Sequence, residues 1–230
     1  MTDLELLTVG RISIDLYCGQ LGAGWHEATA FAKAVGGSPT NVAIAAARLG
    51  RRAALYSKVG ADPFGDVAVA ELRSSGVDVS YVGVQDDGVT PLAFAVLDPP
   101  ENPQLHFRRQ PPVPDFQLRS GEVPAAVVTG VGVLWISGGA LAQQPCRTTV
   151  QEMLSARGRR SHTVLDLDYR PSFWDSRAEA SAVIGGAIDH ATIAVGNREE
   201  CAVAVGTADP RAAAARLLER GVELAIVKLG

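Results

Sequence analysis

GGSPTNVAIAAARLGRRAALYSKVG, residues 36–60, is the stretch that decides the fold. Its glycine pair lies just ahead of Asn41, and an apolar run with helical spacing then extends to Gly50. A strand-like run that ends at Gly60 follows. This order predicts a turn that exposes backbone, a polar side chain at the mouth of a helix, and a strand behind that helix. Such a surface suits a small polar ligand.

Strand-like and helix-like segments alternate along much of the chain. Short apolar runs that are typical of buried strands occur at residues 4–10, 53–60, 132–138, 162–168, 191–196 and 222–230. Helical patterns lie between the later strands, and the one after Asp209 is expected to turn Ala214, Leu217 and Leu218 inward. The alternation predicts an α/β fold with a mostly parallel sheet and helices on both of its faces.

Two segments do not fit a buried parallel sheet. Residues 11–36 and about 88–112 contain runs in which apolar and polar residues alternate, as in half-exposed strands. We expect a small separate β-sheet that acts as a lid over the carboxyl edge of the main sheet, where ligands of such folds bind. Residues 1–230 then form a single α/β domain. The predicted strand ends under the lid carry Gly10, Gly37, Gly138, Gly139, Asp168 and Asn197.

Composition excludes several classes of function. The net charge of −4 provides no general field for nucleic acid, and no apolar run reaches the ~18 residues of a membrane span. The amino-terminal residues include acidic side chains where a signal peptide would be basic, so a cytoplasmic location is expected. The three cysteines lack CxxC spacing and are expected as reduced, mostly buried thiols. The four histidines lack metal-ligand spacing.

Several motifs together resemble a known family. GRISIDLY, GGSPTNVAIAAARLG, SKVGADPFG, DLDYRPSFW, VGNREE and VKLG follow one another in the order found in ribokinase-like (PfkB) carbohydrate kinases. The resemblance covers essentially the whole chain. Within the family, GRISIDLY, GGSPTN and DLDYRPSFW look most like the 5-dehydro-2-deoxygluconokinases, the sugar-acid kinases of myo-inositol breakdown. The 2-keto-3-deoxygluconate kinases and the fructokinases are the next closest.

The resemblance implies transfer of the ATP γ-phosphoryl group to a sugar hydroxyl, assisted by Mg²⁺. It also implies a catalytic aspartate in a C-terminal GxGD segment, which would lie beyond Gly230. The 230 residues are therefore expected to contain no catalytic base and to be inactive by themselves. A non-catalytic sugar-binding module stays open as the alternative. Relatives also suggest a homodimer formed through the outer face of the lid.

Five residues are candidates for substrate binding. Gly36 and Gly37 remove side-chain bulk at the turn, and Asn41 can both donate to and accept from a sugar hydroxyl. Asp15 can accept hydrogen bonds from hydroxyl groups, and Arg108 could pair with the carboxylate of a sugar acid. Their simpler interpretations are a turn with a polar helix start, a solvent-facing carboxylate and a surface arginine.

Four further residues are candidates by resemblance for the phosphate end of the reaction. Arg170 would lie near the transferred phosphate, although a structural pair with Asp168 is the simpler interpretation. Asn197 and Glu200 have the spacing of a capping box and would also organise ATP phosphates and the water ligands of Mg²⁺. Lys228, at the end of the last strand, would approach the nucleotide or else be a surface lysine.

Overall fold

The computed structural model describes residues 3–99, 104–160 and 162–229. Its main feature is a sheet of seven parallel strands in the order β11-β10-β9-β8-β1-β4-β5. The strands are β1 (Leu6–Val9), β4 (Ala53–Gly60), β5 (Val82–Gln85), β8 (Val133–Ser137), β9 (Thr163–Asp166), β10 (Ile193–Asn197) and β11 (Leu224–Lys228). The chain first adds strands on one side of β1 and later on the other side. The direction in which strands are added therefore reverses between β1 and β8.

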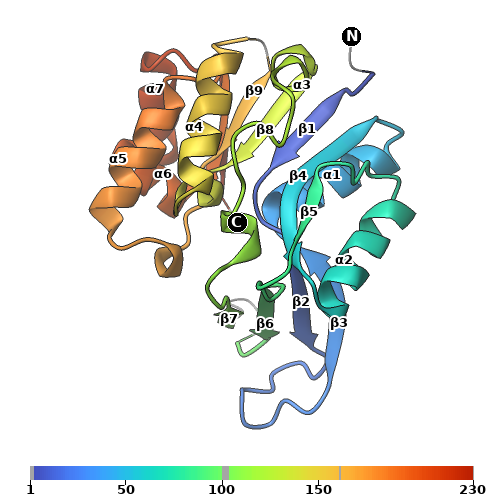
Figure 1. Ribbon diagram of the computed structural model, residues 1–230. Coiled ribbons are helices and arrows are strands. Elements are labelled where there is room, and N and C mark those ends of the chain that lie inside the picture. The colour runs from blue at the N-terminus through green and yellow to red at the C-terminus, as the bar shows by residue number, and fades with distance from the viewer. Residues whose placement is uncertain (1–2, 100–103, 161, 230) are drawn as a thin grey trace.

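Helices cover both sides of this sheet (Figure 1). They are α1 (Ser38–Arg48), α2 (Pro63–Ser74), α3 (Ala125–Gly130), α4 (Cys146–Arg157), α5 (Arg177–Ile188), α6 (Arg198–Val205) and α7 (Pro210–Glu219). Their starts carry the expected signals: Asp62, Ser176 and Asp209 accept hydrogen bonds from backbone N–H groups in the first turn of α2, α5 and α7. No helix in the described residues is long and apolar enough to cross a membrane.

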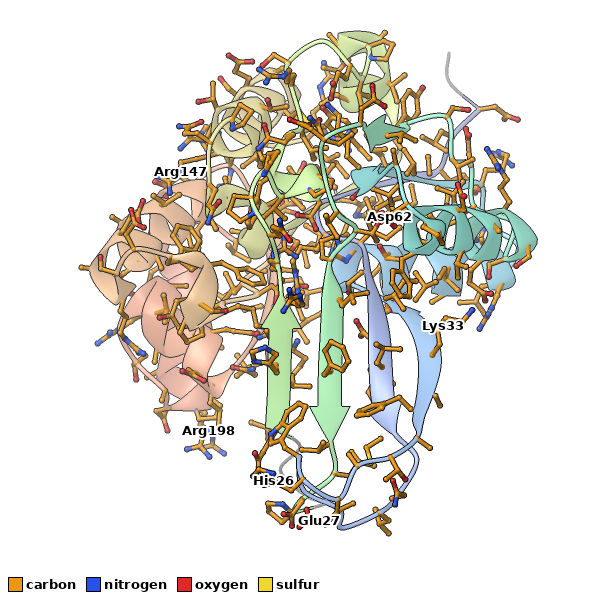
Figure 2. The ribbon with its side chains drawn as sticks, turned by 60° about the horizontal axis from the view of Figure 1, so that its bottom comes forward. His26, Glu27, Lys33, Asp62, Arg147 and Arg198 are labelled. Atoms are coloured by element: carbon orange, nitrogen blue, oxygen red, sulfur yellow. The ribbon has the colours of Figure 1, made fainter. Side chains whose placement is uncertain are left out.

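A second sheet of four strands projects below the first (Figure 1). Its order is β3 (Phe31–Gly36), β2 (Ser13–Cys18), β6 (Leu92–Val96) and β7 (Gln104–Arg108), with β2 parallel to β6 and the outer pairs antiparallel. Figure 2 shows His26 and Glu27 at the far end of this sheet, in the loop between β2 and β3. The small sheet confirms the predicted separate β layer; residues 100–103 of the predicted segment lie outside the described residues.

The core consists of two packed groups of side chains. On one side of the large sheet, Leu55 of β4 packs with Ala43 of α1 and with Leu72 of α2. On the other side, Leu7 and Tyr56 belong to a larger group that includes α3, α4 and α5. Strands β1 and β9 are buried at every position, as strands covered on both faces must be.

The inward faces of two helices differ from the sequence pattern. In α7, Leu217 is buried, but Leu218 is 49% exposed because Ala213 and Leu217, four residues apart, form the buried stripe. In α1, the helical spacing of Val42, Ala45, Ala46 and Leu49 indicates one face, but the buried residues are Pro39, Thr40 and Ala43. Leu49, the residue after the helix, is 80% exposed. Both segments contain apolar residues on several sides, so spacing alone could not select the packed face.

Candidate functional site

A pocket of about 220 Å³ lies where the small sheet meets the carboxyl edge of the large one. The small sheet, the start of α1 and the segments that follow β1 and β9 contribute to its lining. Its polar residues are Arg11, Ser13, Asp15, Ser38, Asn41 and Arg170. The small sheet also contributes Tyr17, Ala93, Leu105 and Phe107, and Gly37 completes the lining. The structure thus brings together Asp15, Gly37, Asn41 and Arg170, four of the residues that the sequence marks as candidates.

Asp15 is held in place on β2 by its neighbours on the same face. Ser13 Oγ donates a hydrogen bond to one carboxylate oxygen at 2.7 Å, and Tyr17 OH donates to the other at 3.4 Å. Burial, and then the charge of Asp15, raise the pKa of the Tyr17 hydroxyl. A fixed carboxylate of this kind can accept hydrogen bonds from the hydroxyl groups of a ligand.

The two glycines of the turn are needed because protein atoms occupy the space that a side chain would take. A Cβ on Gly36 would lie 2.1–2.3 Å from the Asp15 carboxylate. Gly37 has φ 105°, and a Cβ there would lie 2.3 Å from the carbonyl oxygen of Arg11. The glycines therefore allow β2, β3 and α1 to approach one another, whereas the sequence suggested that they make room for the ligand.

The first turn of α1 presents polar groups to the pocket. Asn41 is exposed, and the described residues offer its side-chain amide no hydrogen bond, so the amide is free to bind a ligand. Thr40 Oγ1 donates a hydrogen bond to the Arg11 carbonyl at 2.9 Å and ties the helix start to the end of β1. Ser38 lines the pocket and donates to Asp166 at the end of β9.

Charged side chains of alternating sign connect the carboxyl ends of four strands. Arg11 follows β1, Asp168 and Arg170 follow β9, Glu200 lies in α6 after β10, and Lys228 ends β11. The successive nitrogen–oxygen distances are 3.0 Å from Arg11 to Asp168, 3.0 Å from Asp168 to Arg170, 3.3 Å from Arg170 to Glu200 and 3.8 Å from Glu200 to Lys228. The Asp168–Arg170 pair expected as the simpler interpretation is present, and Arg170 also lines the pocket.

Asp168 and Asp166 have opposite electrostatic environments. Burial raises the pKa of Asp168, but Arg11, Arg170 and the Ser137 hydroxyl together outweigh it and hold that pKa below the usual range. No cation in the described part of the chain forms an ion pair with Asp166. Burial and the nearby Asp168 raise its pKa to about 6, even though the hydrogen bond from Ser38 acts in the other direction. One oxygen of Asp166, Oδ1, is buried without a partner among the described residues.

Asn197 and Glu200 form the capping box that their spacing predicts. Glu200 N–H donates to Asn197 Oδ1 at 2.9 Å, and Asn197 N–H donates to Glu200 Oε2 at 2.7 Å. Arg170 contacts the other oxygen of Glu200, so both carboxylate oxygens are engaged. This arrangement fits an indirect role through water better than direct metal ligation. The described residues contain no cluster of three or more His, Cys, Asp or Glu side chains that could hold a metal ion.

The structure does not bring Arg108 to the pocket. Arg108 is exposed and lies opposite Leu92, whereas the adjacent Phe107 lies opposite Ala93 and lines the pocket with it. Because side chains alternate along a strand, Arg108 belongs to the outer face of the small sheet. The neighbouring Arg109 is buried in an ion pair with Asp115.

Sequence reasoning missed Arg11 and Asp166 as residues of the site. Arg11 directly follows Gly10 at a predicted strand end, so its position was a usable signal. Asp166 precedes Asp168 by two residues on the same strand end. Trp174, the last residue of the DLDYRPSFW motif, is 7% exposed and packs in the core rather than lining the pocket. The three cysteines are free and buried, as expected.

Comparison with known proteins places this site in context. The model of the family described as pfkB family carbohydrate kinase matches residues 3–230. A protein of Geobacillus kaustophilus named 5-dehydro-2-deoxygluconokinase is 35% identical over 86% of this chain and 59% of its own length. One of the same name from Shouchella clausii is 33% identical over 98% of the chain and 70% of its own length. The chain thus spans about three fifths to seven tenths of these relatives.

Solved structures share the fold. A PfkB protein from Polaromonas sp. JS666 superposes with a TM-score of 0.86 at 23% identity, over 99% of this chain and 77% of its own. The fructokinase of Halothermothrix orenii gives a TM-score of 0.86 at 22% identity, over 99% and 80% of the two chains. A putative ribokinase II from E. coli, solved in complex with ATP and Mg²⁺, gives a TM-score of 0.84 at 21% identity, over 99% of this chain and 73% of its own.

Proposed function

Because the chain belongs to the pfkB family of carbohydrate kinases, we propose that it serves the ATP-dependent phosphorylation of a sugar-acid hydroxyl, assisted by Mg²⁺. The observation that carries this proposal is the pocket between the two sheets. It combines a fixed carboxylate, Asp15, with the free amide of Asn41 and the guanidinium groups of Arg11 and Arg170. Such groups suit a ligand that has several hydroxyls and a negative charge.

The proposed substrate is 5-dehydro-2-deoxygluconate, as in myo-inositol catabolism. Two similarities support it: the segments GRISIDLY, GGSPTN and DLDYRPSFW, and the names of the relatives at 33–35% identity. Asp15 and Asn41 are the proposed side-chain contacts of the sugar, and the Gly36–Gly37 turn, in which Gly37 lines the pocket, is the proposed backbone contact. For the carboxylate, sequence and structure point to different residues, since Arg108 is marked by the sequence and Arg11 lies in the pocket.

The phosphate groups of ATP are proposed to bind near the part of the charged row that runs from Arg170 to Lys228. The Arg170 side chain is 33% exposed and lines the pocket, so its positive charge could act on a transferred phosphoryl group. Asn197, Glu200 and Lys228 are the proposed ATP contacts, with Glu200 acting on Mg²⁺ through water. Bound Mg²⁺ would supply charge neutralisation for the phosphates. The catalytic aspartate is proposed beyond Gly230.

Two further parts of the proposal concern assembly and location. We propose a homodimer through the small-sheet face that carries Leu16, Phe31 and Phe94, where the two phenylalanine rings are 5.8 Å apart. Sedimentation equilibrium would show a monomer if this is wrong.

A cytoplasmic location is supported by three free cysteines.

The test is ADP release by the full gene product with four sugars: 5-dehydro-2-deoxygluconate, 2-keto-3-deoxygluconate, fructose and ribose. Turnover confined to 5-dehydro-2-deoxygluconate is the expected result. Turnover of 2-keto-3-deoxygluconate alone would identify that sugar acid as the substrate instead. Turnover of fructose or ribose alone would refute a sugar-acid kinase. No turnover, together with calorimetric binding of a sugar acid, would support the non-catalytic binding module.

A further inference from the structure

We infer that Arg11 determines specificity by binding the carboxylate of the sugar acid; this rests on the proposed kinase function and names a contact within it. Arg11 is only 6% exposed, yet it lines the pocket. A buried arginine at the wall of a polar pocket costs desolvation free energy, so its remaining N–H groups need a partner. The proposal assigns that partner to the substrate.

Contacts on several sides fix the position of the Arg11 guanidinium. Its Nη2 donates to both Asp168 oxygens, at 3.3 and 3.0 Å, and its Cζ lies 5.2 Å from the centre of the Phe173 ring. Asp168 is itself held by Ser137 Oγ at 2.8 Å. The Arg11 backbone carbonyl accepts from Thr40, so both ends of the residue are anchored. A ligand therefore meets a preorganised donor.

The guanidinium retains unused hydrogen-bonding capacity. Nη2 is taken by Asp168, and Nε is buried without an acceptor. Across the described parts of the chain, no residue accepts a hydrogen bond from Nη1. Nη1 is therefore the group that can bind a ligand in the pocket. A carboxylate there would form a charge-assisted hydrogen bond, whereas a neutral sugar would offer a weaker partner.

The distribution of charge favours the same assignment. Arg11, Arg170 and Asp15 are the charged residues that line the pocket. Asp168 is shared between the two arginines, and Glu200 also pairs with Arg170. Arg170 thus has two carboxylate partners, while Arg11 shares one. Arg11 is the less neutralised of the two, so an anionic substrate gains most there.

The experiment compares Arg11→Lys with wild type in the full gene product. The substrates are 5-dehydro-2-deoxygluconate and its analogue in which the carboxylate is reduced to an alcohol. Wild type should prefer the acid in kcat/KM, and the variant should lose at least about tenfold of that preference, as expected for one charge-assisted hydrogen bond. The KM for the acid should rise while the KM for ATP stays within twofold, a split that general damage to the fold would not produce.

Arg108→Lys is the competing variant. An undiminished preference for the acid in Arg11→Lys, or a loss of preference in Arg108→Lys alone, would overturn the assignment to Arg11 while leaving a sugar-acid kinase intact. Absence of any acid turnover in wild type would instead refute the proposed function. If Arg11→Lys does not fold, a crystal structure of wild type with gluconate decides: a carboxylate bound at Arg11 supports the inference, and one bound elsewhere overturns it.

Discussion

Asp168 is the residue on which the geometry of the site depends, because it fixes two arginines from different elements. It binds Arg11 at 3.0 Å, Arg170 at 3.0 Å and Ser137 at 2.8 Å. A buried carboxylate with such partners stays ionised, which keeps both guanidinium groups in position. Its removal would leave the buried Arg11 without a carboxylate among the described residues and Arg170 with Glu200 alone. Loss of one partner of a buried ion pair is commonly strongly destabilising.

Asp166 should make stability depend on pH in the opposite sense from Asp168. The pKa of Asp166 is about 6 in the folded protein, above its ordinary value of 3.8, so its ionisation opposes folding. This contribution favours the fold below about pH 4 and is lost as the pH rises to about 6. Asp166→Asn can still accept from Ser38 but cannot ionise. In chemical denaturation, its stability relative to wild type should increase between pH 4.5 and 7; a constant difference would contradict the assignment.

Gly37→Ala should destabilise the protein more than Gly50→Ala. Both glycines have positive φ, 105° and 77°, and both lie at ends of α1. A Cβ at Gly50 meets nothing within 4 Å, so only the backbone cost of about 1–2 kcal/mol applies there. At Gly37, the clash between the new Cβ and the Arg11 carbonyl oxygen adds to this backbone cost. Urea unfolding of the two variants measures the difference, and equal losses would refute the close approach.

At this scale the sequence predicted local features well and distant partners poorly. Asp15 and Asn41 could be recognised from the motifs around them, and both line the pocket. The nearby partner of Asp168, Arg170, was also foreseen, but its distant partner was not, because Arg11 lies 157 residues away in the chain. Likewise, the side of β7 on which Arg108 lies depends on the register between β6 and β7, which the sequence does not state.

The capping box at the start of α6 links stability to the proposed ATP site. Asn197→Ala removes the acceptor for Glu200 N–H and should cost about 1 kcal/mol. Ser176→Ala removes the equivalent cap of α5, where Ser176 Oγ accepts from Glu179 N–H at 3.0 Å, and should cost about as much. Urea unfolding gives both values. Only Asn197→Ala should also weaken ATP binding in calorimetry. Equal ATP affinity in both variants would show that Asn197 does not contribute to the nucleotide site.

Strong periodicity made most elements predictable. The buried strands β1, β4, β8 and β9 and the capped helices α2 and α7 agree with the patterns in the sequence. The short elements β5, with four residues, and α3, with six, were missed. Neither has enough length to establish a period, and each forms because neighbouring elements provide its contacts.

At the scale of the molecule, the pocket results from the order of the strands. β1 and β8 are adjacent although their sequences are far apart, and the chain continues from them in opposite directions across the sheet. The small sheet lies against this edge, so residues 11–41 and residue 170 meet in one pocket. The sequence indicated this edge and the extra β layer, but the pairing of Arg11 with Asp168 required the strand order.

The edge strand β11 should make the 230-residue chain associate at high concentration. Leu224 is 50% exposed and Ile226 43% exposed, on a strand that pairs with β10 among the described residues. The double variant Leu224→Lys, Ile226→Lys should lower concentration-dependent light scattering. Leu49→Lys, at an 80% exposed position just after α1, adds charge away from this edge and should have a smaller effect. Equal effects of the two would locate association elsewhere.

The separation of a sugar site from a nucleotide site is tested most directly by an initial-rate matrix for the full gene product, with sugar acid and ATP both varied. Asp15→Asn should raise the KM for the sugar acid about tenfold or more and leave the KM for ATP nearly unchanged, because the Asp15 carboxylate lines the pocket under the small sheet. Lys228→Met should do the reverse. If Asp15→Asn raises both KM values equally, or neither, the pocket is not the sugar site.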